Sequence, residues 1–553
     1  MSDDGRLNII PLGGLGEIGK NMMAIRYQDT IVVIDAGLMF PEDELLGIDI
    51  VIPDISYLVE NRDKVKAILI THGHEDHVGA LPYVLKEINP PLYGSKLTLG
   101  IVEGKLKESN LSNVQLNVVR PRDIIKIGPL EVEFFRVSHS IPDCMGIAIH
   151  TPLGIIFHTG DFKIDQTPVD GQVVDFRKMA ELGEKGVLVM FSDSTNADRP
   201  GFTMSEKVVG NTFSELFGRC EGRIIVTTFA SNVHRIQQVI DTAVKYDRKV
   251  AIVGRSMVNN IKISTQLGYI DIPEGTLIEA EDINKYPPEK IVVATTGSQG
   301  EPMSALTRMA TADHRWVGIK PGDTVIISAT PIPGNEKLVA KTIDLLFKQG
   351  AEVIYEREMG VHVSGHASQE ELKLLLNIIK PRYFIPVHGE YRHLMKHAKI
   401  AESLGMQRSR IFVAENGQII EISKKKAHVA GKVTAGKVLV DGLGVGDVGN
   451  IVLRDRRQLS QDGIIIVVVS INKETGEVVS GPDIVTRGFV YVRESEQLIE
   501  NAKSKVKEAM DQCARKNITE WAIIKSQVRD KLGKHLFEKT GRRPMIMPII
   551  MEI

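Results

Sequence analysis

Thr71-His72-Gly73-His74-Glu75-Asp76-His77 follows directly after Val65-Lys66-Ala67-Ile68-Leu69-Ile70 in this chain. The second stretch is a mostly apolar run that predicts a buried strand, and residues 78–85 predict a helix after the first stretch. A loop that leaves a strand can direct side chains two positions apart into one cavity, which one face of a helix cannot do. Three imidazoles and two carboxylates in such a loop indicate a metal site. The alternative, a solvated polar turn, leaves the density of histidines unexplained.

Imidazole and carboxylate ligands without a thiolate suit zinc, and also manganese or iron. Because a zinc ion needs three or four protein ligands, the others must arrive from further strand ends. Later strand-like runs end in His139, Asp161 and His388. A lone histidine or aspartate after a strand is usually a turn or capping residue, but three such endings beside the first cluster favour ligands.

These residues resemble the metallo-β-lactamase superfamily, whose signature is His-x-His-x-Asp-His, a later His and a later Asp. Within it the chain is similar to the β-CASP branch and, in particular, to the bacterial ribonuclease J family. Phe191-Ser192-Asp193-Ser194-Thr195-Asn196, His362-Val363-Ser364-Gly365-His366 and Pro386-Val387-His388-Gly389-Glu390 resemble the three motifs added in that branch. The resemblance covers nearly the whole chain. Every ligand position is filled, which favours an active enzyme over a silent paralogue.

The resemblance implies an α/β fold in which a metallo-β-lactamase αββα sandwich is interrupted by an inserted β-CASP domain, with a small α/β domain at the C-terminus. Continuous apolar strands alternate with helices from about residue 205, which independently predicts a parallel sheet covered on both faces. The expected boundaries are 1–205 and 361–430 for the two parts of the metallo-β-lactamase domain, 206–360 for the β-CASP domain, 431–458 for a closing strand and linker, and 459–553 for the C-terminal domain.

The family motifs imply a role for each matching residue. His72, His74 and His139 would hold one metal, Asp76, His77 and His388 the second, and Asp161 would bridge them. Two Zn²⁺ per subunit are implied, with Mn²⁺ as the alternative. His366 is the candidate general acid and Asp193 the residue that orients it, although Asp193 by itself also suits a helix cap or an Asx-turn.

The resemblance implies two further sites. A pocket for a 5′-monophosphate would be built from small and hydroxyl-bearing residues whose backbone lets a phosphate approach, with polar strand-to-helix turns as the alternative. It comprises Ser231, Asn232, His362, Val363, Ser364, Gly365, His366, Ala367 and Ser368. A structural Ca²⁺ would be held by Asp49, Asp441 and the Gly47 carbonyl, although two distant acids are more often plain surface groups.

The resemblance implies a metal-dependent ribonuclease with 5′-to-3′ exonuclease and endonuclease activity in the maturation and decay of mRNA and rRNA. A hydroxide shared by the metals would attack the phosphodiester and leave a 5′-phosphate and a 3′-hydroxyl. The substrate would be single-stranded RNA with a 5′-monophosphate, and a homodimer or homotetramer is expected. The alternatives are a weakly active RNA-binding or scaffolding subunit beside a paralogue in an RNA-decay complex, and a DNA-directed β-CASP nuclease.

Bulk composition is compatible with these expectations. The 553 residues are 43% hydrophobic and 25% charged, which is typical of a globular protein with two to four domains. A net charge of −2 gives no global attraction for a polyanion, so RNA would bind in a local groove. The three cysteines suggest neither disulfides nor a thiolate site. No signal peptide or membrane span is recognised, so we expect a cytoplasmic protein without membrane contact.

Gly14-Leu15-Gly16-Glu17-Ile18-Gly19 fits the pattern of a dinucleotide-binding loop, with Asp35 at the distance of a ribose-binding acid. That reading requires a helix directly after the glycines. Residues 21–27 and 30–35 instead suggest two strands joined by a turn at Gln28-Asp29. We therefore expect a hairpin and no nucleotide site.

Overall fold

The structure is a computed structural model that describes residues 5–42, 44–301, 303–332, 334–355, 359–472, 478–490, 495–516, 518 and 520–553. The chain separates into two compact units. The first comprises Met1–Phe40 and Ile50–Val438, and the second comprises Pro41–Asp49 and Leu439–Ile553. In the described ranges no helix has the length and apolar character needed to cross a membrane.

Two sheets face each other in the first unit. The first has the order β23 (Ala427–Lys432), β22 (Gln418–Ile422), β1 (Leu7–Gly13), β3 (Met22–Tyr27), β4 (Thr30–Ile34), β6 (Val65–Leu69), β7 (Leu92–Gly94) and β8 (Leu116–Val118). The second has the order β20 (Tyr383–Val387), β13 (Val187–Asp193), β12 (Gly154–His158), β11 (Met145–Thr151), β10 (Leu130–Arg136) and β9 (Ile124–Ile127). Strand residues alternate between faces, so Ile25 and Val32 of the first sheet share one buried cluster with Phe134 and Ile147 of the second.

Helices flank these sheets. They are α1 (Ser56–Glu60), α2 (Glu75–Val78), α3 (Leu81–Glu87), α4 (Lys96–Glu108), α5 (Phe176–Lys185), α11 (Gln369–Ile379) and α12 (Tyr391–Ser403). The helix α4 contacts β7 and β8 of the first sheet, whereas α12 contacts β20 of the second and α5 packs against α11. The expected metallo-β-lactamase sandwich is confirmed.

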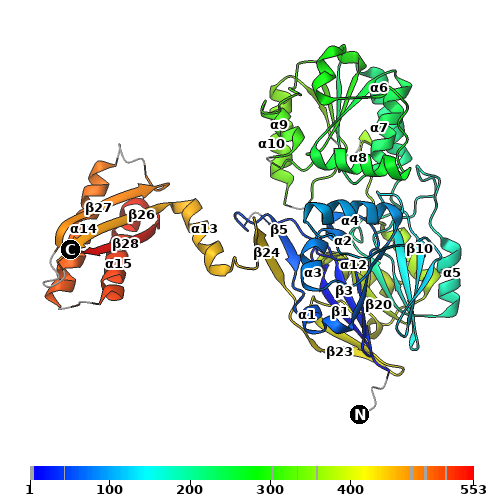
Figure 1. Cartoon of the computed structure of the whole chain (residues 1–553), viewed down its shortest axis with the longest axis horizontal. Coiled ribbons are helices and arrows are strands. Elements are labelled where there is room, and N and C mark those ends of the chain that lie inside the picture. Colours follow the sequence, from blue (N-terminus) through cyan, green and yellow to red (C-terminus); the bar gives the residue numbers. More distant parts are fainter. Residues whose placement is uncertain are drawn as a thin grey trace. The chain divides into compact units, whose positions relative to one another are not determined.

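An entirely parallel sheet is inserted between β13 and β20. Its order is β16 (Leu277–Ile278), β15 (Lys249–Val253), β17 (Ile291–Thr295), β14 (Ile224–Thr227), β18 (Thr324–Ile327) and β19 (Glu352–Ile354). Figure 1 shows α6 (Lys207–Arg219) and α7 (Val233–Lys245) on one side, and α9 (Ala305–Ala310) and α10 (Glu336–Lys348) on the other. Met257 and Ile261 of α8 (Arg255–Leu267) belong to the same buried cluster as residues of α6 and α7. Ile224 and Ile225 of β14 accordingly belong to different buried clusters. Strands that are buried on both faces read as continuous apolar runs, which explains why the insertion was recognisable in the sequence.

The glycine-rich N-terminal segment forms strands. β2 (Leu15–Gly16) pairs with β21 (Gly389–Glu390), and β3 and β4 form an antiparallel pair with Gln28 in the left-handed turn between them. A Cβ on Gly13 would lie 1.9 Å from the Lys20 carbonyl oxygen, so only glycine fits there. The expected hairpin is confirmed: in the described residues 21–35 two strands follow these glycines, where a dinucleotide-binding loop would lead into a helix.

The second unit contains a sheet of order β27 (Val478–Arg487), β26 (Ile464–Ile471) and β28 (Met545–Glu552). The helices α14 (Glu496–Arg515) and α15 (Trp521–Thr540) cover one of its faces and enclose a small apolar core. Figure 1 shows both helices against this sheet. β24 (Lys437–Asp441) and β25 (Gly444–Val445) precede the helix α13 (Asn450–Asp462), which overlaps the end of the segment 431–458 that was expected as a closing strand and linker. The expected small α/β C-terminal domain is confirmed.

Candidate active site

The candidate ligands gather where strands of both sheets end. His72 and His74 follow β6, His139 follows β10, and Asp161 follows β12. His388 follows β20 and adopts a left-handed conformation with a φ of 52°. Such a conformation is uncommon outside glycine and is often found at functional sites. All seven ligand positions expected from the sequence therefore lie in one place.

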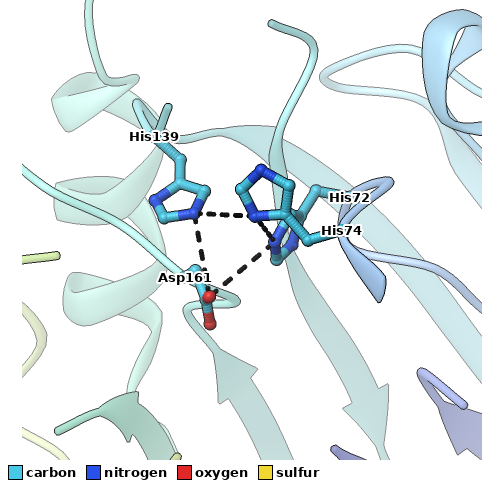
Figure 2. A group of neighbouring side chains, drawn as sticks. All are labelled: His72, His74, His139 and Asp161. Atoms are coloured by element: carbon cyan, nitrogen blue, oxygen red, sulfur yellow. Dashed lines mark hydrogen bonds and ion pairs between the residues drawn. The ribbon is translucent and has the colours of Figure 1, made fainter. Parts of the chain in front are cut away.

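The first group consists of His72, His74, His139 and Asp161 (Figure 2). His74 Nδ1 lies 3.1 Å from His72 Nε2 and 3.2 Å from His139 Nε2. Asp161 Oδ2 lies 3.7 Å from His72 Nε2 and 3.8 Å from His139 Nε2. Four electron-pair donors thus point toward one another from three separate loops.

The second group consists of Asp76, His77, His388 and the same Asp161. His77 Nε2 lies 3.2 Å from Asp161 Oδ2 and 3.6 Å from Asp76 Oδ2. His388 Nε2 lies 3.3 Å from Asp76 Oδ2, and its Nδ1 lies 2.8 Å from Asp161 Oδ1. Asp161 is therefore shared by both groups, one carboxylate oxygen approaching the first group and both approaching the second.

The spacing of these donor atoms fits a divalent cation. Four ligands at about 2.0–2.1 Å from a tetrahedral zinc ion lie roughly 3.4 Å from one another. The distances of 3.1, 3.2, 3.7 and 3.8 Å in the first group bracket that value. Burial lowers the pKa values of His72 and His139 well below the usual range, so both are neutral, as a ligating imidazole must be.

The carboxylates set the charge of the second group. Burial alone would lower the pKa of His388, but Asp161 and then Asp76 raise it to about 10. Burial likewise opposes charge on Asp161, yet His388 and His77 hold the pKa of that carboxyl well below its usual range. A cation that took the place of the His388 proton would meet two ionised carboxylates.

The second ring nitrogen of three histidines is held by the protein. The Thr71 hydroxyl lies 3.0 Å from His72 Nδ1 and donates to Asp35. Asp35 Oδ2 lies 2.7 Å from His77 Nδ1. The Gly365 carbonyl accepts from His139 Nδ1 at 2.7 Å. These contacts select the tautomer that leaves Nε2 free to bind a metal.

Asp35→Asn is expected to weaken binding of Zn²⁺ or Mn²⁺ by about 10- to 100-fold, because it removes the carboxylate that orients His77. Titration of the demetallated protein with each metal measures the change. Glu133→Gln provides a buried carboxylate control, because Glu133 contacts His150 and Lys178 and not the ligands. Equal metal affinity in Asp35→Asn and wild type would contradict the role given to Asp35.

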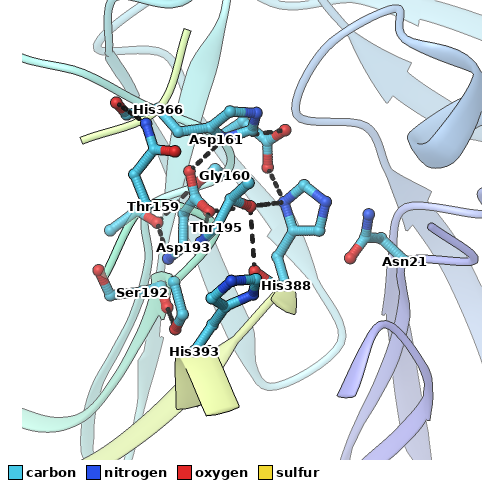
Figure 3. Close-up of polar contacts among 12 residues, drawn as sticks. Asn21, Thr159, Gly160, Asp161, Ser192, Asp193, Thr195, His366, His388 and His393 are labelled. Atoms are coloured by element: carbon cyan, nitrogen blue, oxygen red, sulfur yellow. Dashed lines mark hydrogen bonds and ion pairs between the residues drawn. The ribbon is translucent and has the colours of Figure 1, made fainter. Parts of the chain in front are cut away.

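His366 and Asp193 form a pair beside the second group (Figure 3). Asp193 Oδ2 lies 2.7 Å from His366 Nδ1, and Asp193 Oδ1 accepts from the Thr195 amide at 3.0 Å. One Asp193 oxygen therefore makes the Asx-turn considered from the sequence, and the other contacts His366. Burial lowers the pKa of His366, but Asp193 outweighs it and raises the pKa overall. Asp193 thereby favours the protonated form of His366.

The residues expected to bind phosphate lie in two segments that Arg235 connects. Its fully buried guanidinium donates to the Ser328 and Val363 carbonyls and contacts His362 Nδ1 at 2.8 Å. It is also paired through two hydrogen bonds with Glu206, at 2.8 and 2.9 Å. This network ties the start of α7 to the segment 362–368.

Several members of the expected phosphate pocket also have structural contacts. Asn232 caps α7, and Ser368 forms a capping box with Glu371 at the start of α11. The Ser364 hydroxyl accepts from Asn196 Nδ2 at 2.8 Å. Ser231, Gly365 and Ala367 lie in the same two segments. Phosphate binding there stays a prediction.

Arg235→Gln is expected to reduce the free energy of unfolding by about 3–5 kcal/mol, because Glu206 would be left buried without its partner. Denaturant unfolding measures the change. The double variant Arg235→Gln, Glu206→Gln should lose less than the sum of the two single variants, because each single change already breaks the same pair. Additive losses would show that the two side chains are energetically independent.

The three residues expected to hold calcium lie within the second unit. Asp441 is paired with Arg456, whose guanidinium also donates to the Leu46 carbonyl at 2.9 Å. The Asp49 carboxylate accepts from the Gly442 amide at 2.8 Å. A Cβ on Gly47 would lie 2.7 Å from the same arginine. Arg456 therefore supplies positive charge beside this site, and calcium there stays a prediction.

Sequence reasoning missed Asp35, Thr71, Asn196 and the Arg235–Glu206 pair. Asp35 was considered only as a ribose-binding acid, and the structure places it against His77 instead. Its position at the end of an apolar strand next to β6 was the one available signal. Arg235 carries no local signal, because a charge on an amphipathic helix normally faces solvent.

Models of four known protein families match this chain. The metallo-beta-lactamase superfamily matches residues 15–176 and the ribonuclease J beta-CASP domain matches residues 221–346. A zinc-dependent metallo-hydrolase RNA specificity domain matches residues 350–413, and the ribonuclease J C-terminal domain matches residues 451–553. The matches follow the order of the sheets along the chain.

Similar proteins agree with these matches. The chain is 49% identical to ribonuclease J2 of Bacillus subtilis (strain 168), over 99% of both chains. It is 45% identical to ribonuclease J 2 of Staphylococcus aureus (strain NCTC 8325 / PS 47), over 99% of this chain and 98% of the relative. A crystal structure of a protein of unknown function from Enterococcus faecalis V583 has a similar fold, with a TM-score of 0.54 and 17% identity over 75% of this chain and 100% of that chain. The protein therefore belongs to the ribonuclease J family of metallo-β-lactamase, β-CASP ribonucleases.

Proposed function

We propose that the protein is a two-metal ribonuclease that removes nucleotides successively from a 5′-monophosphorylated end of single-stranded RNA and also cuts RNA internally. The observation that supports this most directly is the sharing of Asp161 between two donor groups, with His366 and Asp193 beside them. Two Zn²⁺ ions, or Mn²⁺, fit the donor set. Such activity serves RNA maturation and decay in the cytoplasm.

The chain's own residues account for binding and proton transfer. Divalent ions, when bound, activate water and neutralise charge that develops on the phosphate. His366 is the proton donor for the leaving 3′ oxygen, so the products carry a 5′-phosphate and a 3′-hydroxyl. Asp193 keeps His366 protonated before the reaction and orients its ring through Nδ1. Segment 362–368 supplies backbone amides and hydroxyls for the 5′-phosphate.

Matched RNA and DNA strands with a 5′-monophosphate or a 5′-triphosphate test this function. The purified protein with Zn²⁺ or Mn²⁺ should cleave RNA and release mononucleotides fastest from the monophosphorylated end. Preferential cleavage of DNA would support the DNA-directed alternative. Absence of RNA cleavage together with tight RNA binding would support the scaffolding alternative, which the complete ligand set disfavours.

A homodimer or homotetramer is part of the proposal, because one face of the C-terminal sheet exposes apolar side chains. Met547, Ile549 and Met551 alternate along β28 with exposed fractions of 45%, 40% and 46%, and Val479 and Val485 of β27 are also exposed. Apolar residues that share one sheet face mark an interaction surface. Ile549→Lys should shift the protein to a smaller species in light scattering. An unchanged mass would place the subunit contact elsewhere.

A further inference from the structure

A cavity of about 370 Å³ lies against His139, outside the two donor groups. Its walls come from residues 136–143 after β10, residues 165–172 after β12, and the ends of α7 and α8 at His234 and Tyr269. Its volume falls within the range of about 300–1,000 Å³ that is usual for small-molecule sites. The cavity therefore lies between the metal ligand His139 and the start of α7, where Asn232 is expected to contact the 5′-phosphate.

Four carboxylates line this cavity, and each has a partner in the protein. Asp165 accepts from the Thr167 and Glu206 amides, and Glu206 is paired with Arg235. The other two are Asp143, which accepts from the Tyr269 hydroxyl, and Asp170. Among the described residues that line it, Arg136 is the one arginine and there is no lysine. A phosphate would be repelled here, whereas a neutral group with N–H donors would find acceptors.

His234 provides a second observation that points to a ligand. It is 9% exposed and lines the cavity. Within the described part of the chain, its buried Nε2 atom has no hydrogen-bond partner. Asp170 Oδ2 lies 3.4 Å away, which is the distance of an ion pair when His234 is protonated but is long for a hydrogen bond, while Asp170 Oδ1 accepts from the Gln172 amide at 2.9 Å. A buried polar atom without a partner costs free energy that a bound ligand would recover.

We propose that this cavity receives the nucleobase of the 5′-terminal nucleotide and favours bases with an exocyclic amino group, guanine above all. The proposal rests on the proposed function, because it requires the terminal phosphate to lie at segment 362–368 and the first phosphodiester at the two donor groups. The base of the first nucleotide, which joins these two phosphates, must then lie beside His139. Guanine presents two adjacent donors, N1–H and the 2-amino group, which match the two oxygens of a carboxylate such as Asp170 or Asp143. Uracil presents only N3–H.

Four 5′-monophosphorylated RNAs that differ only in the first nucleotide test the proposal. Wild type should release a first guanosine monophosphate faster than a first uridine monophosphate by roughly tenfold, the effect of one hydrogen bond to a charged group. Asp170→Asn and Asp143→Asn should each reduce this preference, and the double variant should abolish it. Asn tolerates the left-handed conformation of Asp143. Asp247→Asn is the matched control and should keep the preference, because the Asp247 carboxylate contacts Lys290 at the surface.

Binding of 5′-GMP and 5′-UMP to the same proteins separates this proposal from the proposed function. Tighter binding of 5′-GMP that Asp170→Asn removes would support the cavity even if wild type cleaved no RNA. Equal release of all four first nucleotides, or a preference that survives in the double variant, would overturn the proposal. Binding of Mg²⁺ that Asp170→Asn removes, without any dependence on the nucleobase, would overturn it in favour of a cation site. Melting temperatures of the variants show whether each one is folded.

Discussion

Asp161→Ala is expected to reduce the rate of RNA cleavage by at least about 10³-fold, the scale on which loss of one central catalytic group is felt. Asp161 belongs to all three clusters of potential metal ligands. Its Oδ2 atom approaches His72 and His139 in the first group and His77 in the second. Loss of this carboxylate therefore removes a ligand from both groups at once.

Single-turnover cleavage of 5′-monophosphorylated RNA measures this effect, and elemental analysis of the purified variant measures its bound metal. We expect reduced metal content together with lost activity, because loss of Asp161 leaves each group with only three donors. Asp247→Asn is the matched control, since it removes one surface carboxylate charge without touching the site. Undiminished cleavage by Asp161→Ala would refute the two-metal proposal.

His366→Gln is expected to slow cleavage by about 10²- to 10⁴-fold, the usual contribution of a positioned general acid. The 2.7 Å contact with Asp193 Oδ2 fixes the ring, and glutamine cannot donate a proton to the leaving oxygen. An RNA with a sulfur atom in place of the leaving 3′ oxygen needs no such donor, because a thiolate leaves readily. This substrate should be cleaved at similar rates by wild type and His366→Gln. An equal loss on both substrates would assign His366 a structural role instead.

The pH dependence of cleavage should depend on the pair formed by His366 and Asp193. Asp193 raises the pKa of His366 above its ordinary value despite burial, so activity that needs the acid form should fall as pH rises through that pKa. Asp193→Asn removes the negative charge and leaves burial to dominate, which lowers the pKa of His366. The alkaline limb of the pH profile should therefore move to lower pH in this variant. An alkaline limb at the same pH would show that another group titrates there.

Much of the fold was predictable because its signals are local. The inserted sheet consists of continuous apolar strands such as Ile291–Thr295, and these are recognisable since both faces of a parallel sheet are buried. The hairpin at β3 and β4 was predictable from two apolar, strand-like runs on either side of one turn. The helix α13 was missed because none of its residues is buried, so it shows no apolar stripe.

For the site, the ligand types and the strand ends that carry them could be inferred from the amino-acid sequence alone. Residues 72–77 indicate a metal site in the sequence, because the chemistry and spacing of their side chains are local properties of one loop. Only the tertiary structure decided that Asp161 lies between both groups, that Asp35 holds His77, and that Arg235 reaches His362 from another domain. The physical reason is that these contacts join residues far apart in the chain. Their partners are chosen by how the two sheets and the inserted domain pack, which no local pattern encodes.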